Sequence, residues 1–256
     1  MSHPDPIAFS IGSIDIRWYG VLIALGMLLG VIISCKRAPQ QGLTEDDVLD
    51  TVIWMLPAAV IGARLYYVLF NLSMYHSLAD ALNMRNGGLA IHGGLIFGII
   101  TVVIVCRYKK IKALNMIDLL MPVVALGQAI GRWGNFFNGE AHGGPTDLPW
   151  GILVDGVKVH PTFLYESIWC LILFIFLSWF AKNHRTFNGQ ILALYGVLYS
   201  IERFFVEALR TDSLMIGNFK QAQVLSLTVI VVSILLYIYC SKHYQLENAD
   251  KNVNNM

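Results

Sequence analysis

Charged residues are scarce in this chain of 256 residues, since Asp, Glu, Lys and Arg together make up 14% of it. A soluble domain usually carries about 25%. Hydrophobic residues reach 56%, and the mean hydropathy is +0.59. The net charge is only +1, and no basic block is longer than the short cluster at 107–112, so no nucleic acid is expected as a partner. This composition is typical of an integral membrane protein.

Several catalytic motifs are also missing. The sequence has no P-loop, no dinucleotide fingerprint, no H-E-x-x-H and no G-x-S-x-G. Of the four cysteines, none has metal-site spacing and none falls in an expected outer loop. We therefore expect no metal, no cofactor and no structural disulfide, and the redox, nucleotide and metal-hydrolase classes lose support.

Long apolar stretches are what the chain has instead. Seven are long enough to cross about 30 Å of hydrocarbon. They lie at roughly 18–35, 50–70, 89–106, 113–131, 161–181, 188–209 and 221–240. We predict an all-α integral membrane protein with seven transmembrane helices, forming one polytopic domain over 1–240. An outer loop is expected at 132–160, with a hairpin turning at Asp155-Gly156, and a polar cytoplasmic tail at 241–256.

Lys and Arg are more frequent after the first, third, fifth and seventh stretches than elsewhere. Cytoplasmic loops carry the excess of positive residues, so the N-terminus is predicted outside and the C-terminus in the cytoplasm. The polar segment G-R-W-G-N-F-F-N-G-E at 131–140 then lies at the outer leaflet. Ionisable groups beside hydrocarbon are costly unless they meet a partner or ligand, so this segment is the expected functional site.

The sixth stretch carries a polar face. Tyr199, Arg203 and Glu207 are spaced i, i+4 and i+8, with Arg210 three residues further on. One interpretation is an Arg203–Glu207 ion pair that only holds helices together. The other is an anionic ligand, which would account for Arg132 and Arg203 together, because one structural pair does not require both cations.

His92 is the only histidine placed inside an apolar stretch, and it is followed by Gly93 and Gly94. Such a residue often forms a hydrogen bond between helices. Histidine also exchanges a proton near neutral pH. Since His92 is expected near the outer end of its helix, at the level of Arg132, it is the candidate general base.

Five segments occur in an order that resembles the bacterial prolipoprotein diacylglyceryl transferase family. They are R-W-Y-G at 17–20, H-G-G-L at 92–95, the decamer at 131–140 followed by Gly143, H-P-T-F-L-Y-E at 160–166 and E-R-F-F-V-E-A-L-R at 202–210. The similarity runs from residue 6 to about 240. Two departures from the family pattern are Trp133, where other members often have Leu, and the short outer loop at 141–160.

The resemblance implies an enzyme of the bacterial cytoplasmic membrane, multi-pass, with its active site toward the outer leaflet. Such enzymes move the diacylglyceryl group from phosphatidylglycerol to the lipobox Cys thiol of prolipoprotein signal peptides. A thioether forms and glycerol 1-phosphate leaves, in the first step of lipoprotein maturation, without metal or nucleotide. Its partners are thus phosphatidylglycerol, the prolipoprotein and the lipid bilayer.

The resemblance also assigns site residues. The catalytic set is His92, Arg132, Arg203, Tyr19, Tyr199 and Glu207. The substrate-binding set is Arg132, Asn135, Asn138, Glu140, Gly143 and Arg203. Arg132 matches the arginine that binds the lipid phosphate, whereas Asp118 and Glu166 are interpreted as secondary and structural.

Two other functions remain open. A transporter for an anionic solute would place polar residues through to the inner face and would show duplicated halves. A phosphotransferase acting on the same head group would need an acidic metal-binding cluster in most versions. Neither pattern is evident in the sequence.

Overall fold

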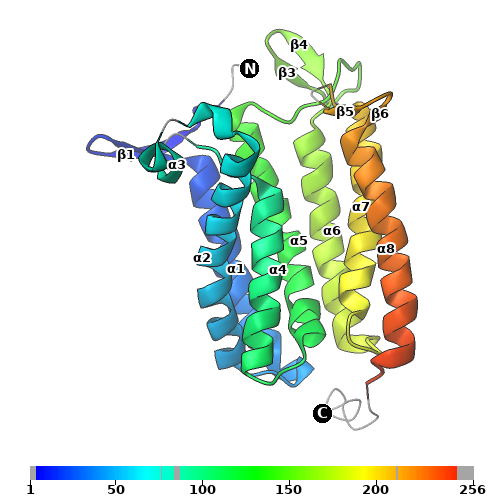
Figure 1. The fold of residues 1–256 in the computed structure, drawn as a ribbon. Coiled ribbons are helices and arrows are strands. Elements are labelled where there is room, and N and C mark those ends of the chain that lie inside the picture. Colours follow the sequence, from blue (N-terminus) through cyan, green and yellow to red (C-terminus); the bar gives the residue numbers. More distant parts are fainter. Residues whose placement is uncertain (1–3, 76, 84–86, 212, 247–256) are drawn as a thin grey trace. The chain divides into compact units, whose positions relative to one another are not determined.

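The computed structural model describes residues 4–75, 77–83, 87–211 and 213–246, and most of them are helical (Figure 1). The long helices are α1 (Trp18–Arg37), α2 (Glu45–Phe70), α4 (Ile91–Tyr108), α5 (Ala113–Asn138), α6 (Thr162–Asn183), α7 (Gln190–Leu209) and α8 (Gln221–His243). Short helical turns are η1 (Ala38–Gln41), η2 (Leu72–Met74) and α3 (Leu78–Leu82). The predicted tail lies outside the described residues from 247 onward.

Three antiparallel hairpins complete the described chain. They pair β1 (Ile7–Ile11) with β2 (Ile14–Arg17), β3 (Ile152–Val154) with β4 (Val157–Val159), and β5 (Met215–Ile216) with β6 (Phe219–Lys220). The second is the predicted hairpin: Asp155 and Gly156 have φ of 49° and 81°, as a tight I′-type turn requires. The first and third hairpins were not predicted.

All seven predicted stretches form helices. Among the described residues, six helical segments are long and apolar enough to cross a membrane: α1 with η1, α2, α4, α5, α6 and α8. Helix α7 is the exception, because it carries Glu202, Arg203 and Glu207. A multi-pass helical membrane protein is therefore confirmed.

The predicted outer loop at 132–160 needs a correction. Helix α5 continues to Asn138, so the first part of the expected loop forms the last two turns of a helix. The apolar run ends near residue 131, which is where a hydropathy argument stops. The helix continues because Arg132 and Trp133 find partners on α6, Glu166 and Ser167.

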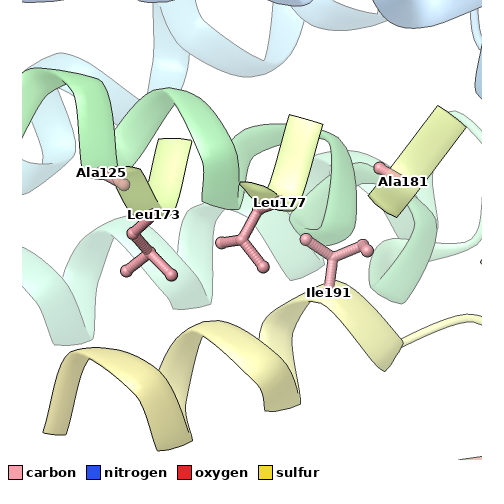
Figure 2. Close-up of a cluster of buried hydrophobic side chains, with 5 residues drawn as sticks. All are labelled: Ala125, Leu173, Leu177, Ala181 and Ile191. Carbon is pink, nitrogen blue, oxygen red and sulfur yellow. The ribbon is translucent and has the colours of Figure 1, made fainter. Parts of the chain in front are cut away.

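The described chain forms two compact units. The large unit comprises Met1–Ser34 and Asp118–Met256, and the small unit comprises Cys35–Ile117. In the large unit, α5, α6 and α7 share an apolar core (Figure 2) made of Ala125, Leu173, Leu177, Ala181 and Ile191.

Helix α8 packs beside α7 (Figure 1). Its buried residues are Ser226, Ser233 and Cys240, at intervals of seven. A Cβ built on Gly196 of α7 would overlap Ser233, so the two helices approach closely. Apolar residues such as Leu235 are exposed. Small residues between helices and apolar residues outward are the pattern of packing in lipid.

In the small unit, α2 and α4 form an antiparallel pair (Figure 1). Thr44 and Asp47 form a reciprocal capping box at the start of α2, with hydrogen bonds of 3.1 and 3.0 Å. Lys109, just after α4, pairs with Asp47 at 3.0 Å and with Asp50 at 2.5 Å. These ion pairs tie the end of α4 to the start of α2.

Candidate active site

A cluster of charged side chains joins α5, α6 and α7 in the large unit. The carboxylate of Glu166 on α6 is 1% exposed and forms an ion pair through Oε2 with Nη2 of Arg132 on α5. Its other oxygen, Oε1, lies 3.1 Å from Nη1 of Arg203 on α7 and 4.0 Å from Nη1 of Arg210. Three guanidinium groups therefore surround one buried carboxylate.

Arg203 is held from two sides. Its Nη2 pairs with Oε2 of Glu207 at 2.7 Å, one turn along α7, while Nη1 pairs with Glu166. The predicted Arg203–Glu207 pair is thus present, but it does not use the whole guanidinium. The side chains of Arg132 and Arg203 are 19% and 20% exposed, so both are only partly buried.

Glu202 was not predicted as a site residue, although an ionisable residue within an apolar stretch is an indication of a functional site. It is 7% exposed, and within the described chain neither carboxylate oxygen has a hydrogen-bond partner. Its charge interacts with those of Glu166, Arg132 and Arg203. A buried carboxyl group without partners is unusual and raises the free energy of the folded state.

Tyr19 and Tyr199 take different places in the large unit. The ring of Tyr19 covers Gly134 of α5 so closely that a Cβ there would overlap it. This contact explains why a glycine is needed at the second glycine position of the G-R-W-G segment. It places Tyr19 against the residue that follows Arg132 by two positions, which is about half a helical turn along α5. The Tyr199 ring stacks on Tyr195 at 5.5 Å with an interplanar angle of 8°.

The polar end of α5 is organised by Glu140. Its Oε1 accepts hydrogen bonds from Nδ2 of Asn135 at 3.0 Å and from Nδ2 of Asn138 at 3.1 Å. Gly139, at φ 69°, allows the chain to turn back after the helix. Three predicted substrate-binding residues therefore form one hydrogen-bonded group.

Gly143 lies where three segments meet. Its N–H donates to the carbonyl of His160 at 2.8 Å, and it forms a bridge with Arg210. A Cβ at this position would crowd His160, Thr162 and the carbonyl of Leu209. The geometry thus supplies a packing reason for this glycine, and its amide is already in use; substrate binding by Gly143 stays a prediction.

His92 belongs to the small unit, whereas the charged cluster belongs to the large one. It is the second residue of α4, its side chain is exposed, and its ring centroid lies 6.0 Å from that of Tyr66. Its role as base stays a prediction.

The contacts of Asp118 hold the start of α7 in place. Its carboxylate accepts hydrogen bonds from the N–H groups of Gly189 at 2.7 Å and Leu192 at 2.9 Å, and pairs with Arg185 at 3.1 Å. It therefore caps the start of α7 from a distant helix. Over the described part of the chain, no group of three or more His, Cys, Asp or Glu residues could hold a metal ion.

The apolar helices and the cluster define a helical membrane protein with a partly buried group of paired arginines and carboxylates. Residues 6–239 match the model of the family described as prolipoprotein diacylglyceryl transferase. The chain therefore belongs to that family.

Similar proteins agree with this assignment. A phosphatidylglycerol–prolipoprotein diacylglyceryl transferase of Clostridioides difficile is 53% identical over 253 residues, covering 98% of each chain. Proteins of the same name from Finegoldia magna and Clostridium kluyveri are 51% and 48% identical. These matches cover 93% and 92% of this chain and 96% of each relative.

Proposed function

We propose that this protein transfers the diacylglyceryl group of phosphatidylglycerol to the lipobox cysteine of prolipoproteins. The observation that carries the proposal is the convergence of Arg132 and Arg203 on the two oxygens of Glu166. Guanidinium groups recognise carboxylates and phosphates through the same paired geometry. Glu166 would keep both arginines oriented until the lipid phosphate arrives.

The reaction is an alkyl transfer. The thiol sulfur bonds to the glycerol carbon that carries the phosphate, and the C–O bond breaks with its electrons passing to the oxygen. Glycerol 1-phosphate leaves with one more negative charge, which Arg132 and Arg203 would stabilise in the transition state. His92 is the proposed acceptor of the thiol proton.

Other residues would orient the substrate rather than react. Tyr19, Tyr199 and Glu207 would set the geometry around the arginines. The head group would be bound by the hydrogen-bonded group Asn135, Asn138 and Glu140, next to Gly143. Fixed placement of reacting groups lowers the entropic part of the barrier.

The proposal includes a membrane topology. Helix α7 would also cross the membrane, which brings the number of crossings to seven. Its charges are tolerable there because Arg203 and Glu207 neutralise one another and Glu166 supplies further negative charge. The N-terminus would lie outside and the C-terminus in the cytoplasm of a bacterium, placing the cluster toward the outer leaflet of the cytoplasmic membrane. There it would meet both the lipid bilayer and secreted prolipoproteins.

The decisive experiment uses phosphatidylglycerol labelled with heavy oxygen at the bridge between diacylglycerol and phosphate, together with a lipobox peptide. Mass spectrometry should find a diacylglyceryl thioether and all label in glycerol phosphate. Label in a diacylglycerol product would indicate P–O cleavage by a phosphotransferase. Transport without any covalent product would contradict the proposal altogether.

A further inference from the structure

Arg64 of α2 is a buried arginine that the proposed reaction does not use. It is 7% exposed, and each of its five N–H groups donates to a different main-chain carbonyl. The acceptors are Ala81 at 2.7 Å, Gly87 at 2.7 Å, Gly88 at 3.0 Å, Asp80 at 3.1 Å and Asn83 at 2.8 Å. Since a guanidinium has five donors, none remains for a ligand.

The acceptors come from one segment: Asp80 and Ala81 belong to α3, and Asn83, Gly87 and Gly88 lie between α3 and α4. Gly87 and Gly88 have φ of 80° and 85°, a conformation that directs both carbonyls onto Nη1 of Arg64. A Cβ on Gly88 would crowd Arg64 and Tyr67. The ring of Tyr75 lies 5.2 Å from the guanidinium carbon and covers it.

This segment leads directly into the turn that carries His92. The N–H of Ala90, the N-cap residue of α4, donates to the carbonyl of Ala63 at 3.0 Å. A Cβ on Gly93 would overlap the carbonyl of Gly62, so that turn lies tightly against α2. His92 therefore lies between Ala90 and Gly93, and these two residues contact Ala63 and Gly62, which immediately precede Arg64.

We propose that Arg64 is a positioning residue for the transfer reaction: by binding these five carbonyls, it sets the start of α4 and thereby the orientation of His92. This rests on the proposed role of His92 as proton acceptor. Arginine is required for its number of donors, because lysine has three and would leave at least two carbonyls without this partner.

A double-mutant cycle tests the proposal on the full-length protein in lipid nanodiscs. Arg64→Lys should lower kcat by roughly 10- to 100-fold, with the KM for phosphatidylglycerol within about twofold, because a misplaced catalytic group slows chemistry more than binding. In a His92→Gln background, the same change should cost less than about twofold, because the two residues act as one unit.

If His92→Gln lowers kcat and Arg64→Lys lowers it further by the same factor as in the wild type, the positioning role of Arg64 is overturned, whereas the base assignment of His92 is not. Full activity of His92→Gln would overturn the base assignment and, with it, this proposal. Gly88→Ala provides a second test if Arg64→Lys does not fold, since it displaces a carbonyl while keeping the arginine, and it should show the same non-additivity. Arg107→Lys, an exposed change near the other end of α4, should leave kcat unchanged.

Discussion

Glu166 is the residue through which the cationic site of the large unit is held together. It accepts ion pairs from Arg132, Arg203 and Arg210, although the sequence interpretation assigned it a secondary place. Breaking a buried ion pair is costly because the remaining charge has no compensation. The cluster thus sets three guanidinium groups against two paired carboxylates, because Glu207 also pairs with Arg203.

Substitutions of Arg132 should distinguish the contribution of the guanidinium geometry to turnover from that of its positive charge. Arg132→Ala should abolish transfer, and Arg132→Lys should remain reduced by roughly 100-fold or more, because a point charge does not reproduce the guanidinium fork. Turnover of phosphatidylglycerol and lipobox peptide is the measurement, with thermal unfolding to check that the variants fold. Wild-type turnover by either variant would remove Arg132 from the reaction.

Glu202 and Glu207 form a matched pair of buried acids on α7 that differ in their partners. Glu202→Gln should leave the protein as stable or more stable by about 1 kcal/mol, because an unsatisfied carboxyl group is replaced by an amide. Glu207→Gln should lower stability by about 1–3 kcal/mol, because it breaks the pair with Arg203. Unfolding in detergent should show this order, and the opposite order would mean that Glu202 has a partner in solution.

At the scale of elements, helix ends and helix contacts are set by residues far away in the chain. Asp118 of α5 caps the start of α7, and Nζ of Lys220 donates to the carbonyls of Glu207, Ala208 and Arg210 at its end. Both interactions satisfy main-chain groups that a helix leaves free. Helix α7 is thereby fixed at both ends, which holds Arg203 in place.

Two glycines of α5 should respond differently to the same substitution. Gly134→Ala should push Tyr19 away and cost about 1–3 kcal/mol, with reduced transfer, because the methyl group overlaps the ring. At Gly127 an added Cβ meets nothing within 4 Å, so Gly127→Ala should be neutral or stabilising. Unfolding and turnover of both variants provide the comparison, and equal behaviour would contradict the packing of Tyr19 on Gly134.

The ion pairs of Lys109 that join α4 to α2 should be lost at alkaline pH. The hydrogen bond to Asp50, and then that to Asp47, raises the pKa of Lys109 above its usual 10.5. The folded state thus holds this proton more tightly than the unfolded state. The stabilisation is complete below pH 10.5 and disappears as the pH rises through the raised pKa.

The difference in Tm between the wild type and Lys109→Met should therefore be present at pH 8 and shrink as the pH rises above 10.5. Its size should be small, since exposed ion pairs contribute little. Lys112→Met, at a nearby exposed lysine, should show no such convergence. A gap that stays constant with pH would exclude the ion pair as its source.

At the scale of the whole molecule, six apolar helical segments place large hydrophobic side chains outward. Exposed residues such as Ile99, Ile172 and Val231 would be unfavourable in water and are favourable in lipid. The lipid surroundings are thus part of the folded state, and the direction in which the chain crosses them decides which substrates can be reached.

Cysteine labelling tests that direction. In a variant whose four native cysteines are replaced, a cysteine in the loop 141–149 should react with a membrane-impermeant maleimide in intact cells. A cysteine at 109–112 should react only after the membrane is opened. The reverse pattern would place the site on the cytoplasmic side and would contradict the proposed topology.

The apolar stretches of the sequence predicted the helices well, since length and hydropathy are local properties of a chain. The prediction was wrong at the end of α5. Arg132 and Trp133 continue the helix only because α6 supplies Glu166 and Ser167, which lie 34 residues further along the chain in both cases. A sequence window does not contain such partners.

The sequence by itself determined the membrane class, the helices, the family and the position of its arginines, because each follows from residue type and order. Only the tertiary structure decided that Glu166 receives the arginines, that Glu202 has no hydrogen bond within the described part of the chain, and that Arg64 binds five main-chain carbonyls before α4. These pairings depend on which helices pack together and at what rotation, and non-local packing is what selects among the partners that a sequence permits.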